Sequence, residues 1–360
     1  MGKYKFPLIT EYLAERGVSF VTDIRKEGKG TVISNTYFVE VGKQNYLIDP
    51  ACGKKRLKQI RSHLTFDAYD VLVTHSHIDH SGNSRFVMAK GSDVIFHPLV
   101  AGKINNFKRN YTDVTVEMVK IFGVEGFFGR TGILGPFMIK TLQFIERYFP
   151  TGLNFIMKMV GLVICRIEAG SVSPPKKNVL FLNYDEIQDL SFGKNVFKGW
   201  PLNEHLFALD TPGHQDDHLS FYLPDKKIMF SGDLISFLNP NDILDGSIKE
   251  TKIGMKKMLQ LAEDGGIDVL ALSHQLPIIG KDKVISYLDS IVREHEEVFN
   301  IVAETVSSHP DKTDLTGIIS KVCAHDSDLM KKILKINYPR SNTFIEVYVY
   351  IYLKEFVNYD

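Results

Sequence analysis

The residues best suited to chemistry lie in one short segment that follows the apolar run Val71-Leu72-Val73. Within six positions the chain places three imidazoles and one carboxylate: His75, His77, Asp79 and His80. Residues two apart at an extended strand end point the same way, so His75 and His77 can offer their rings to one ion. Asp79 and His80, one step further in a turn, would face a neighbouring second position. Because imidazole and carboxylate are ligands of Zn²⁺ and comparable ions, the segment predicts a metal site.

Three further ligand-type residues follow short apolar runs downstream. They are His214 on a Pro-Gly turn, Asp233 after a glycine, and His274 at the end of its run. A carboxylate has two oxygens, so Asp233 can bridge two cations. A polar loop with scattered histidines would explain a single His-x-His. Seven ligand-type residues at four predicted strand ends favour a metal centre instead.

The order and spacing of these residues resemble the metallo-beta-lactamase superfamily, whose pattern is H-x-H-x-D-H, a later His, a bridging Asp and a final His. The resemblance extends from about Thr31 to Leu276. It includes Asn35-Thr36-Tyr37-Phe38 and Leu47-Ile48-Asp49-Pro50, which are similar to the first hairpin of that fold, where the acid of the second strand lies beneath the metals. The implied fold class is α/β, an αββα metallo-beta-lactamase sandwich.

The resemblance also implies roles for single residues. His75, His77 and His214 would hold one metal, Asp79, His80 and His274 the second, and Asp233 would bridge them. Asp79 and Asp233 are the implied catalytic residues. The final histidine lies in Ser273-His274-Gln275 rather than in a Gly-His-Gly setting, which makes it the least secure ligand. The second ligand is His77 where the flavodiiron oxygen reductases of this superfamily carry Glu, which disfavours redox chemistry.

The expected chemistry is hydrolysis. Two divalent ions against Asp79, Asp233 and one hydroxide leave the centre positive by one formal unit, which should attract an anionic or acyl-containing substrate. Metal coordination lowers the pKa of water to roughly 7. We expect a metal-bound hydroxide to attack a thioester, ester or lactone with an apolar part. The alternatives are a phosphodiesterase or ribonuclease of the same fold and a non-enzymatic metal-containing ligand sensor or effector. We expect two Zn²⁺ ions, and the ligands would also suit Fe or Mn²⁺.

Composition indicates an ordinary soluble enzyme. The 360 residues are 44% hydrophobic, and 43 basic residues balance 43 acidic residues, which argues against broad electrostatic capture of nucleic acid. Cys52, Cys165 and Cys323 are odd in number and far apart, as expected for free thiols in a reducing cytosol. The first residues lack the apolar core of a signal peptide. We therefore expect a cytoplasmic protein with a small-molecule substrate and no nucleic-acid partner.

Two helical regions extend the predicted sandwich. We expect residues 1–280 to form the metallo-beta-lactamase-like domain, with a helical insertion at about 100–200, and residues 281–360 to form a C-terminal helical extension. The insertion has apolar helical patterns at 136–148 and 154–167 that charged residues interrupt, so we expect no integral membrane span. Three interpretations stay open: a helical pair that completes its own core or a homodimer interface, a lid for an apolar substrate part, and reversible contact with a membrane surface.

Several other residues have weaker signals. Asp217 and His218 could support the ligands, contact substrate, or be solvated or core-capping residues. His97, before Pro98, is expected to be structural. The remaining histidines are expected on the surface: His63, His295, His309 and His325. At residues 344–356, tyrosines alternate with apolar residues, and this pattern is compatible with either a helix or a strand.

Overall fold

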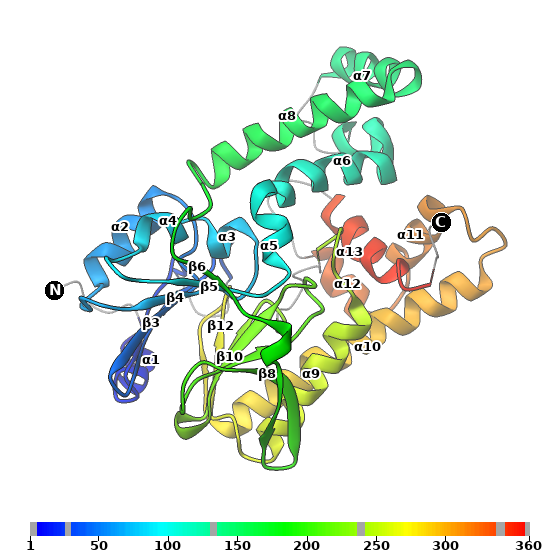
Figure 1. Ribbon diagram of the computed structural model, residues 1–360. Helices are drawn as coiled ribbons and strands as arrows, with labels where there is room; N and C mark the ends of the chain where they lie inside the picture. Colours follow the sequence, from blue (N-terminus) through cyan, green and yellow to red (C-terminus); the bar gives the residue numbers. More distant parts are fainter. Residues whose placement is uncertain (1–5, 26–29, 130–134, 236–241, 336–342, 357–360) are drawn as a thin grey trace.

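Two β-sheets stacked face to face form the centre of the molecule (Figure 1). The computed structural model describes residues 6–25, 30–129, 135–235, 242–335 and 343–356. The first sheet has the order β1-β2-β3-β4-β5-β6, and its strands from β3 to β6 pair in parallel. Its strands are β1 (Val18–Val21), β2 (Thr36–Val41), β3 (Gln44–Ile48), β4 (Asp70–Leu72), β5 (Val94–Phe96) and β6 (Val179–Phe181).

The second sheet has the order β13-β12-β11-β10-β9-β8-β7 and is antiparallel except for the pair β11 and β12. Its strands are β7 (Gln188–Phe192), β8 (Asn195–Pro201), β9 (Phe207–Asp210), β10 (Leu219–Leu223), β11 (Ile228–Gly232), β12 (Val269–Leu272) and β13 (Ile278–Ile279). Because β9 and β11 both run antiparallel to β10, β9, β11 and β12 share one direction. Their carboxyl ends therefore lie at one edge of the sheet.

Alternation along the strands divides the apolar residues between two layers. On β10, Phe221 packs into the core between the sheets with Ile48 of the first sheet, whereas its neighbour Tyr222 faces the outer helices. Helix α2 (Lys54–His63) covers the outer face of the first sheet, and α9 (Ile248–Glu263) and α10 (Lys281–Ser308) cover the second. The predicted αββα sandwich is confirmed.

The predicted helical insertion is also present. Helices α6 (Arg109–Val124), α7 (Pro136–Tyr148) and α8 (Pro150–Glu168) pack on one another and project from the sandwich. The shorter elements of the chain are α1 (Pro7–Ala14), α3 (Ile78–Ser81), α4 (Ser84–Val87), α5 (Val100–Lys103), η1 (Ile104–Asn106), the π-helical η2 (Glu125–Gly129), η3 (Tyr184–Glu186) and η4 (Pro224–Lys226). By length and composition α8 is a helix that could cross a membrane, and 22% of its apolar window is buried. The absence of an integral span stays a prediction.

The C-terminal helices share a core with other parts of the chain. They are α10, α11 (Leu315–Cys323), α12 (Asp328–Lys335) and α13 (Thr343–Leu353), and they pack with Ile243, Ile248 and the α6 residues Val114 and Met118. The strand alternative at residues 344–356 is wrong: α13 is buried on every side from 347 to 353, and a helix inside a core needs no polar face. The domain division at residue 280 stays a prediction.

Two histidines expected on the surface are buried. His295 is 4% exposed and His309 is 8% exposed. The ring of His295 stacks on Tyr352, and its Nδ1 forms a hydrogen bond with the Tyr352 hydroxyl. Imidazole is amphipathic, so a partner 57 positions away in the sequence satisfies it inside the core.

Gly161 sets the distance between α6 and α8, and Gly152 near the start of α8 is its matched control. A Cβ at Gly161 would lie 2.4 Å from the Tyr111 carbonyl oxygen, whereas a Cβ at Gly152 would lie 3.7 Å from Phe149 Cβ. We expect Gly161→Ala to lower the free energy of unfolding by about 1–3 kcal/mol through overpacking. Gly152→Ala should be neutral or stabilising by up to about 1 kcal/mol. Urea unfolding measures both, and equal effects of the two variants would contradict the close packing.

Candidate metal centre

Strand ends from both sheets meet at one edge of the sandwich. Asp49 follows β3 and His75 comes just after β4 in the first sheet. His214, Asp233 and His274 follow β9, β11 and β12 in the second. The carboxyl ends of parallel strands lie at a common edge, so this topology brings the predicted residues together from four strands. His77 joins them from the position just before α3, and Asp79 and His80 join them from α3 itself.

Three histidines form the first group. His75 Nε2 lies 3.0 Å from His77 Nδ1, and His214 Nε2 lies 3.1 Å from the same atom. One nitrogen of each ring lies within 4.8 Å of the others, which is close enough for a shared ion. His75 and His214 are buried, and the His77 side chain is 14% exposed.

Asp79, His80 and His274 form the second group. His80 Nε2 lies 3.3 Å from His274 Nε2, and Asp79 Oδ2 lies 3.4 Å from each of these atoms. Asp233 lies between the two groups. Its Oδ2 is 3.1 Å from His274 Nε2, 3.4 Å from His80 Nε2 and 3.6 Å from His214 Nε2. The structure thus places all seven predicted residues in one cluster and places Asp233 where a bridging ligand would stand.

Hydrogen bonds on the far side of three rings determine which nitrogen carries the proton. His77 Nε2 donates to Asp242 Oδ2 at 2.7 Å, and His80 Nδ1 donates to Asp49 Oδ2 at 2.8 Å. His274 Nδ1 donates to the Thr31 carbonyl at 2.9 Å. A carboxylate or carbonyl oxygen can only accept, so in the neutral ring the opposite nitrogen has a lone pair. In the neutral rings, the inner nitrogens of His80 and His274 therefore present lone pairs to each other at 3.3 Å.

This arrangement fits divalent cations. Lone pairs that face each other repel unless a cation or a proton lies between them, and imidazole with carboxylate is a donor set for Zn²⁺, Fe and Mn²⁺. Polar groups behind the rings orient ligands in metal sites of proteins generally. Asp49 also accepts from Thr74, whose hydroxyl lies 3.1 Å from His75 Nδ1. Polar partners on the side away from the cluster thus orient four of the five imidazole rings.

The electrostatic field divides the histidines into two classes. Burial, reinforced by repulsion from His80, holds the pKa of His75 well below its usual value. Burial lowers the pKa of His214 to about 4. Burial also opposes charge on His77 and His80, but Asp242 raises the pKa of His77 and Asp233 with Asp79 raises the pKa of His80. The acids thus draw positive charge into the site.

The two acids of the ligand cluster are ionised. Burial alone would raise the pKa of Asp79 and of Asp233. Attraction to His80 and His274 outweighs it and holds both pKa values below the usual range. Burial alone would also raise the pKa of Asp242, but the hydrogen bond with His77, the attraction to it and the backbone N–H of Leu244 together outweigh burial and lower this pKa.

Two glycines permit the close packing of these loops. Gly213 has φ 148°, and a Cβ there would lie 2.4 Å from Thr251 Oγ1 on α9. Gly232 has φ 54°, and a Cβ there would lie 2.3 Å from His218 Nε2. Any other residue at either position would be strained and would displace a neighbour. His214 and Asp233 follow these glycines directly, so their positions depend on them.

Asp217 and His218 lie behind the cluster. His218 is fully buried, and its Nε2 accepts the backbone N–H of Asp233 at 3.0 Å. Asp217 is buried 3.8 Å from Lys103 Nζ, and burial raises its pKa. His218 therefore supports the position of Asp233, while neither residue is among the seven clustered residues. His97 is buried with Nε2 3.3 Å from Asp210 Oδ1, in keeping with a structural role.

Asp242 is the residue of the site that spacing in the sequence does not reveal. It lies between β11 and α9, directly after Asn239-Pro240-Asn241 rather than directly after an apolar run, so the strand-end signal is absent. Its backbone N–H donates to the His214 carbonyl, and Ser247 N–H donates to the Gly213 carbonyl. The C-terminal residues hold this loop: Lys354 Nζ donates to the Ile243 carbonyl at 2.7 Å. The position of the His77 partner thus depends on the end of the chain.

An apolar cluster adjoins the open side of the centre. Ile78, between two ligands, packs with Cys52, with Phe107 before α6, and with Cys165 of α8. Tyr111 of α6 packs against the same cluster, and burial with the nearby charge of Asp79 raises its pKa. The base of the insertion therefore forms an apolar wall beside Asp79, which is 23% exposed.

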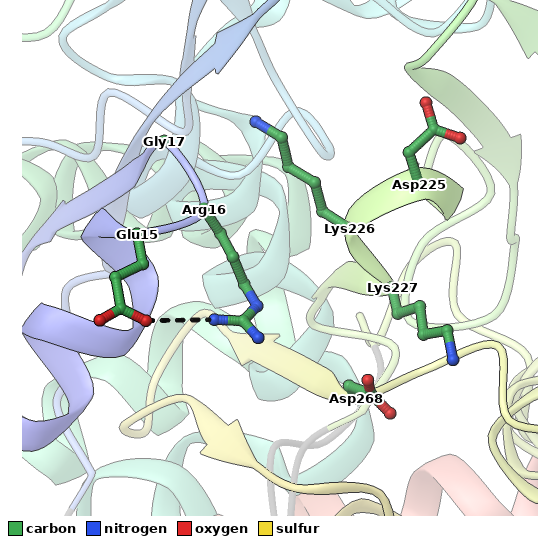
Figure 2. Close-up of a pocket in the computed structure, with 7 residues that line it drawn as sticks. All are labelled: Glu15, Arg16, Gly17, Asp225, Lys226, Lys227 and Asp268. Carbon is green, nitrogen blue, oxygen red and sulfur yellow. Dashed lines mark ion pairs between the residues drawn. The ribbon is translucent and has the colours of Figure 1, made fainter.

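A separate polar pocket lies one strand length from the ligand cluster. Figure 2 shows charged side chains around it from the end of α1, from η4 and from the start of β12. Asp225, Lys226 and Lys227 precede β11, and Asp268 precedes β12, so the pocket lies one strand length from Asp233. Three cations and three acids line it, and no histidine does. It offers neither net charge nor a ligand cluster.

Comparison with known proteins agrees with this architecture. Residues 30–120 match the family model of the metallo-beta-lactamase superfamily. Hydroxyacylglutathione hydrolases of Bartonella tribocorum (strain CIP 105476 / IBS 506) and Bartonella quintana (strain Toulouse) are 34% identical over 62 residues and 36% identical over 59 residues. These matches cover 17% and 16% of this chain and 24% and 23% of the relatives, so the chain matches about a quarter of their length.

Solved structures show the same fold at low sequence identity. A metallo-beta-lactamase family protein of Thermus thermophilus has a TM-score of 0.51 and 18% identity, with 94% of this chain and 92% of that chain covered. The stereoselective inverting sec-alkylsulfatase of a Pseudomonas species has a TM-score of 0.53 and 14% identity, with 91% and 48% covered. The resemblance predicted from the sequence is confirmed: the chain has the fold of the metallo-beta-lactamase superfamily and matches its family model over residues 30–120.

Proposed function

We propose that this protein is a hydrolase that uses two divalent metal ions, Zn²⁺ in the first instance, to cleave an acyl substrate with an apolar part. The observation that carries the proposal is the position of Asp233 Oδ2, within 3.6 Å of ring nitrogens from both ligand groups. In the proposed assignment His75, His77 and His214 hold one ion, Asp79, His80 and His274 hold the other, and Asp233 bridges them.

Some residues of the site would bind the metal ions, and others would also contact substrate or transfer a proton. Ions bound here would supply a nucleophilic water at neutral pH and would polarise an acyl oxygen. His75, His80 and Asp233 are buried, while His77, Asp79 and His274 are partly exposed, so substrate would approach from the side of Asp79. In the proposed mechanism the proton acceptor is Asp79, which is ionised and is the more exposed of the two ligand carboxylates.

Two observations support a thioester, ester or lactone as the substrate class. The apolar wall beside Asp79 suits an acyl chain better than a phosphate backbone, which would be matched by cations. The Bartonella relatives are named as hydroxyacylglutathione hydrolases, which are enzymes for an acyl compound.

The test combines elemental analysis with a substrate panel. Protein purified without added metal would be assayed against thioesters, esters and lactones of increasing chain length, and against phosphodiesters and RNA, with and without chelator. We expect about two metal ions per chain and chelator-sensitive hydrolysis of the acyl compounds. Cleavage of phosphodiesters alone would favour the phosphodiesterase alternative. Bound metal with no turnover of any compound would favour a sensor.

Asp233→Ala should abolish turnover and lower the metal content together, because the variant removes the one oxygen that faces both groups. Asp217→Ala is the matched control, since it also removes a buried carboxylate but leaves the ligand set intact. Lys103, the neighbour of Asp217, keeps its ion pairs with Asp216 and Asp245. Elemental analysis and turnover are measured on both variants. Full activity of Asp233→Ala would refute the bridging role.

Asp242→Asn should weaken metal binding by about 10- to 100-fold, because the amide no longer fixes His77 as a proton donor at Nε2. Asp216→Asn, an exposed neighbour of the same charge whose side chain is 43% exposed, serves as control. Competition with a fluorescent Zn²⁺ chelator gives the two affinities. Equal affinities would show that Asp242 does not position His77.

Acid should remove the metal. Burial opposes charge on His77, His80 and His274, but nearby carboxylates raise the pKa of all three, so protons compete for these rings at a higher pH than at an ordinary histidine. A protonated imidazole cannot bind a cation, so metal affinity should fall as the pH falls from about 8 to about 5. Equilibrium dialysis at several pH values measures it. A pH-independent metal content would contradict the ligand assignment.

A further inference from the structure

The outer face of α7 and α8 exposes an unusual amount of apolar surface. Among the described residues, nine of the sixteen strongly exposed large apolar side chains lie between residues 136 and 168. Five of them are aromatic: Phe137, Phe144, Tyr148, Phe149 and Phe155. Phe137 is 83% exposed and Phe155 is 68% exposed. Scattered exposed residues need no explanation, but a concentration of this kind marks an interaction surface.

The inner face of the same helices is already used. Leu153, Met157, Gly161 and Cys165 are buried along one side of α8, at the four-residue spacing of a helix face. Gly161 lies against the backbone of Tyr111 on α6. This packing fixes α8 along its length and leaves its opposite side outward. The helix therefore presents a fixed amphipathic face, which suits a position on a surface better than a position across a bilayer.

The charges on this face are mainly positive. From 136 to 168 the cations Lys140, Arg147, Lys158 and Arg166 outnumber the acids Glu146 and Glu168. Glu146 turns inward and accepts the backbone N–H of Val124 at 3.1 Å. Lys158 pairs with Asp113, whereas Lys140, Arg147 and Arg166 have no carboxylate partner among the described residues. An apolar, aromatic face with unneutralised cations is complementary to anionic lipid headgroups above an acyl layer.

We propose that the outer face of α7 and α8 docks on the surface of an anionic lipid bilayer. The aromatic rings enter the boundary between headgroups and acyl chains, where rings of this kind concentrate. Lys140, Arg147 and Arg166 meet the lipid phosphates. A second copy of the chain fits less well, because a two-fold interface would bury the cations of both copies together without carboxylates among the described residues of the face to pair with them.

Docking on this face would hold the candidate metal centre near the bilayer. Helix α8 is 19 residues long, about 28 Å. Its last turn carries Cys165, which packs with Ile78 between two ligands. The face itself is independent of the proposed hydrolysis, so lipid binding can be measured without turnover.

The experiment is flotation of the full chain with two kinds of vesicle. One kind is phosphatidylcholine alone, and the other is a mixture of phosphatidylcholine with phosphatidylglycerol. We expect the protein to float with the mixed vesicles, to float weakly with phosphatidylcholine, and to be released as the salt concentration rises. Absence of flotation with both kinds at low salt would overturn the proposal.

Matched variants test the face itself. The triple variant Phe137→Ser, Phe144→Ser, Phe155→Ser should reduce partition into mixed vesicles by at least about tenfold. Its control is Leu8→Ser, Val196→Ser, Ile253→Ser, which removes side chains that are 81%, 46% and 49% exposed elsewhere. Unchanged circular dichroism and thermal unfolding confirm that both variants fold. Equal partition of the two triple variants would overturn the proposal.

A charge variant gives a second, independent measurement. Lys140→Glu with Arg147→Glu should reduce partition by at least about tenfold, because each cation near an anionic surface contributes several-fold. Lys194→Glu with Lys283→Glu is the control with the same change in net charge at exposed sites. Light scattering in the absence of lipid tests the alternative that a second copy of the chain covers the face. A stable dimer that the aromatic variant dissociates would show that a second copy covers the face instead.

Discussion

The convergence of five imidazole nitrogens and two carboxylates on one small volume is the constraint on which the site depends. The bare lone pairs of His80 and His274 repel at 3.3 Å, and buried ionised carboxylates lose their hydration, so this cluster opposes folding unless positive charge enters it. The acids behind the rings, Asp49 and Asp242, make that entry favourable. They fix ring protons on the outer side, and Asp242 raises the pKa of His77 despite burial. The electrostatics of the site therefore favour the entry of cations.

The sandwich supplies the rigidity that such a cluster requires. Asp49, His214, Asp233 and His274 come from strand ends, where the backbone is held by neighbouring strands and cannot relax away from the repulsion. The tight turns at Gly213 and Gly232 leave the following ligands less freedom to move than longer loops would. Helix α9 packs against Gly213, so the outer helical layer also determines where His214 lies. Stability of the core and geometry of the cluster are thus coupled.

Local patterns in the sequence are enough to predict much of this arrangement. Spacing within six residues and apolar runs before each ligand identify all seven clustered residues, and the family resemblance that they carry implies the αββα sandwich. Asp242 does not directly follow an apolar run, and its contact with His77 spans 165 positions, so no local pattern reveals it. The surface position predicted for His295 is wrong because its burial depends on Tyr352, a partner from another helix. The secondary structure of segment 344–356 is ambiguous from the sequence, because its tyrosines alternate with Val and Ile. A half-buried strand and a helix buried on every side are both compatible with that pattern.

The two helical additions contribute to the site in different ways. The C-terminal extension acts through polar contacts: Glu355 Oε1 accepts the backbone N–H of Ile248 at 2.7 Å, and Lys354 holds the loop that carries Asp242. The insertion acts through apolar packing at its base, beside Asp79. Its outer face contributes nothing to either, and exposed apolar area costs roughly 25 cal/mol per Å² relative to burial. This apolar face costs free energy in water and stabilises neither the core nor the ligand cluster. Its exposure is explained if another surface covers it, and its cations favour an anionic lipid surface in that role.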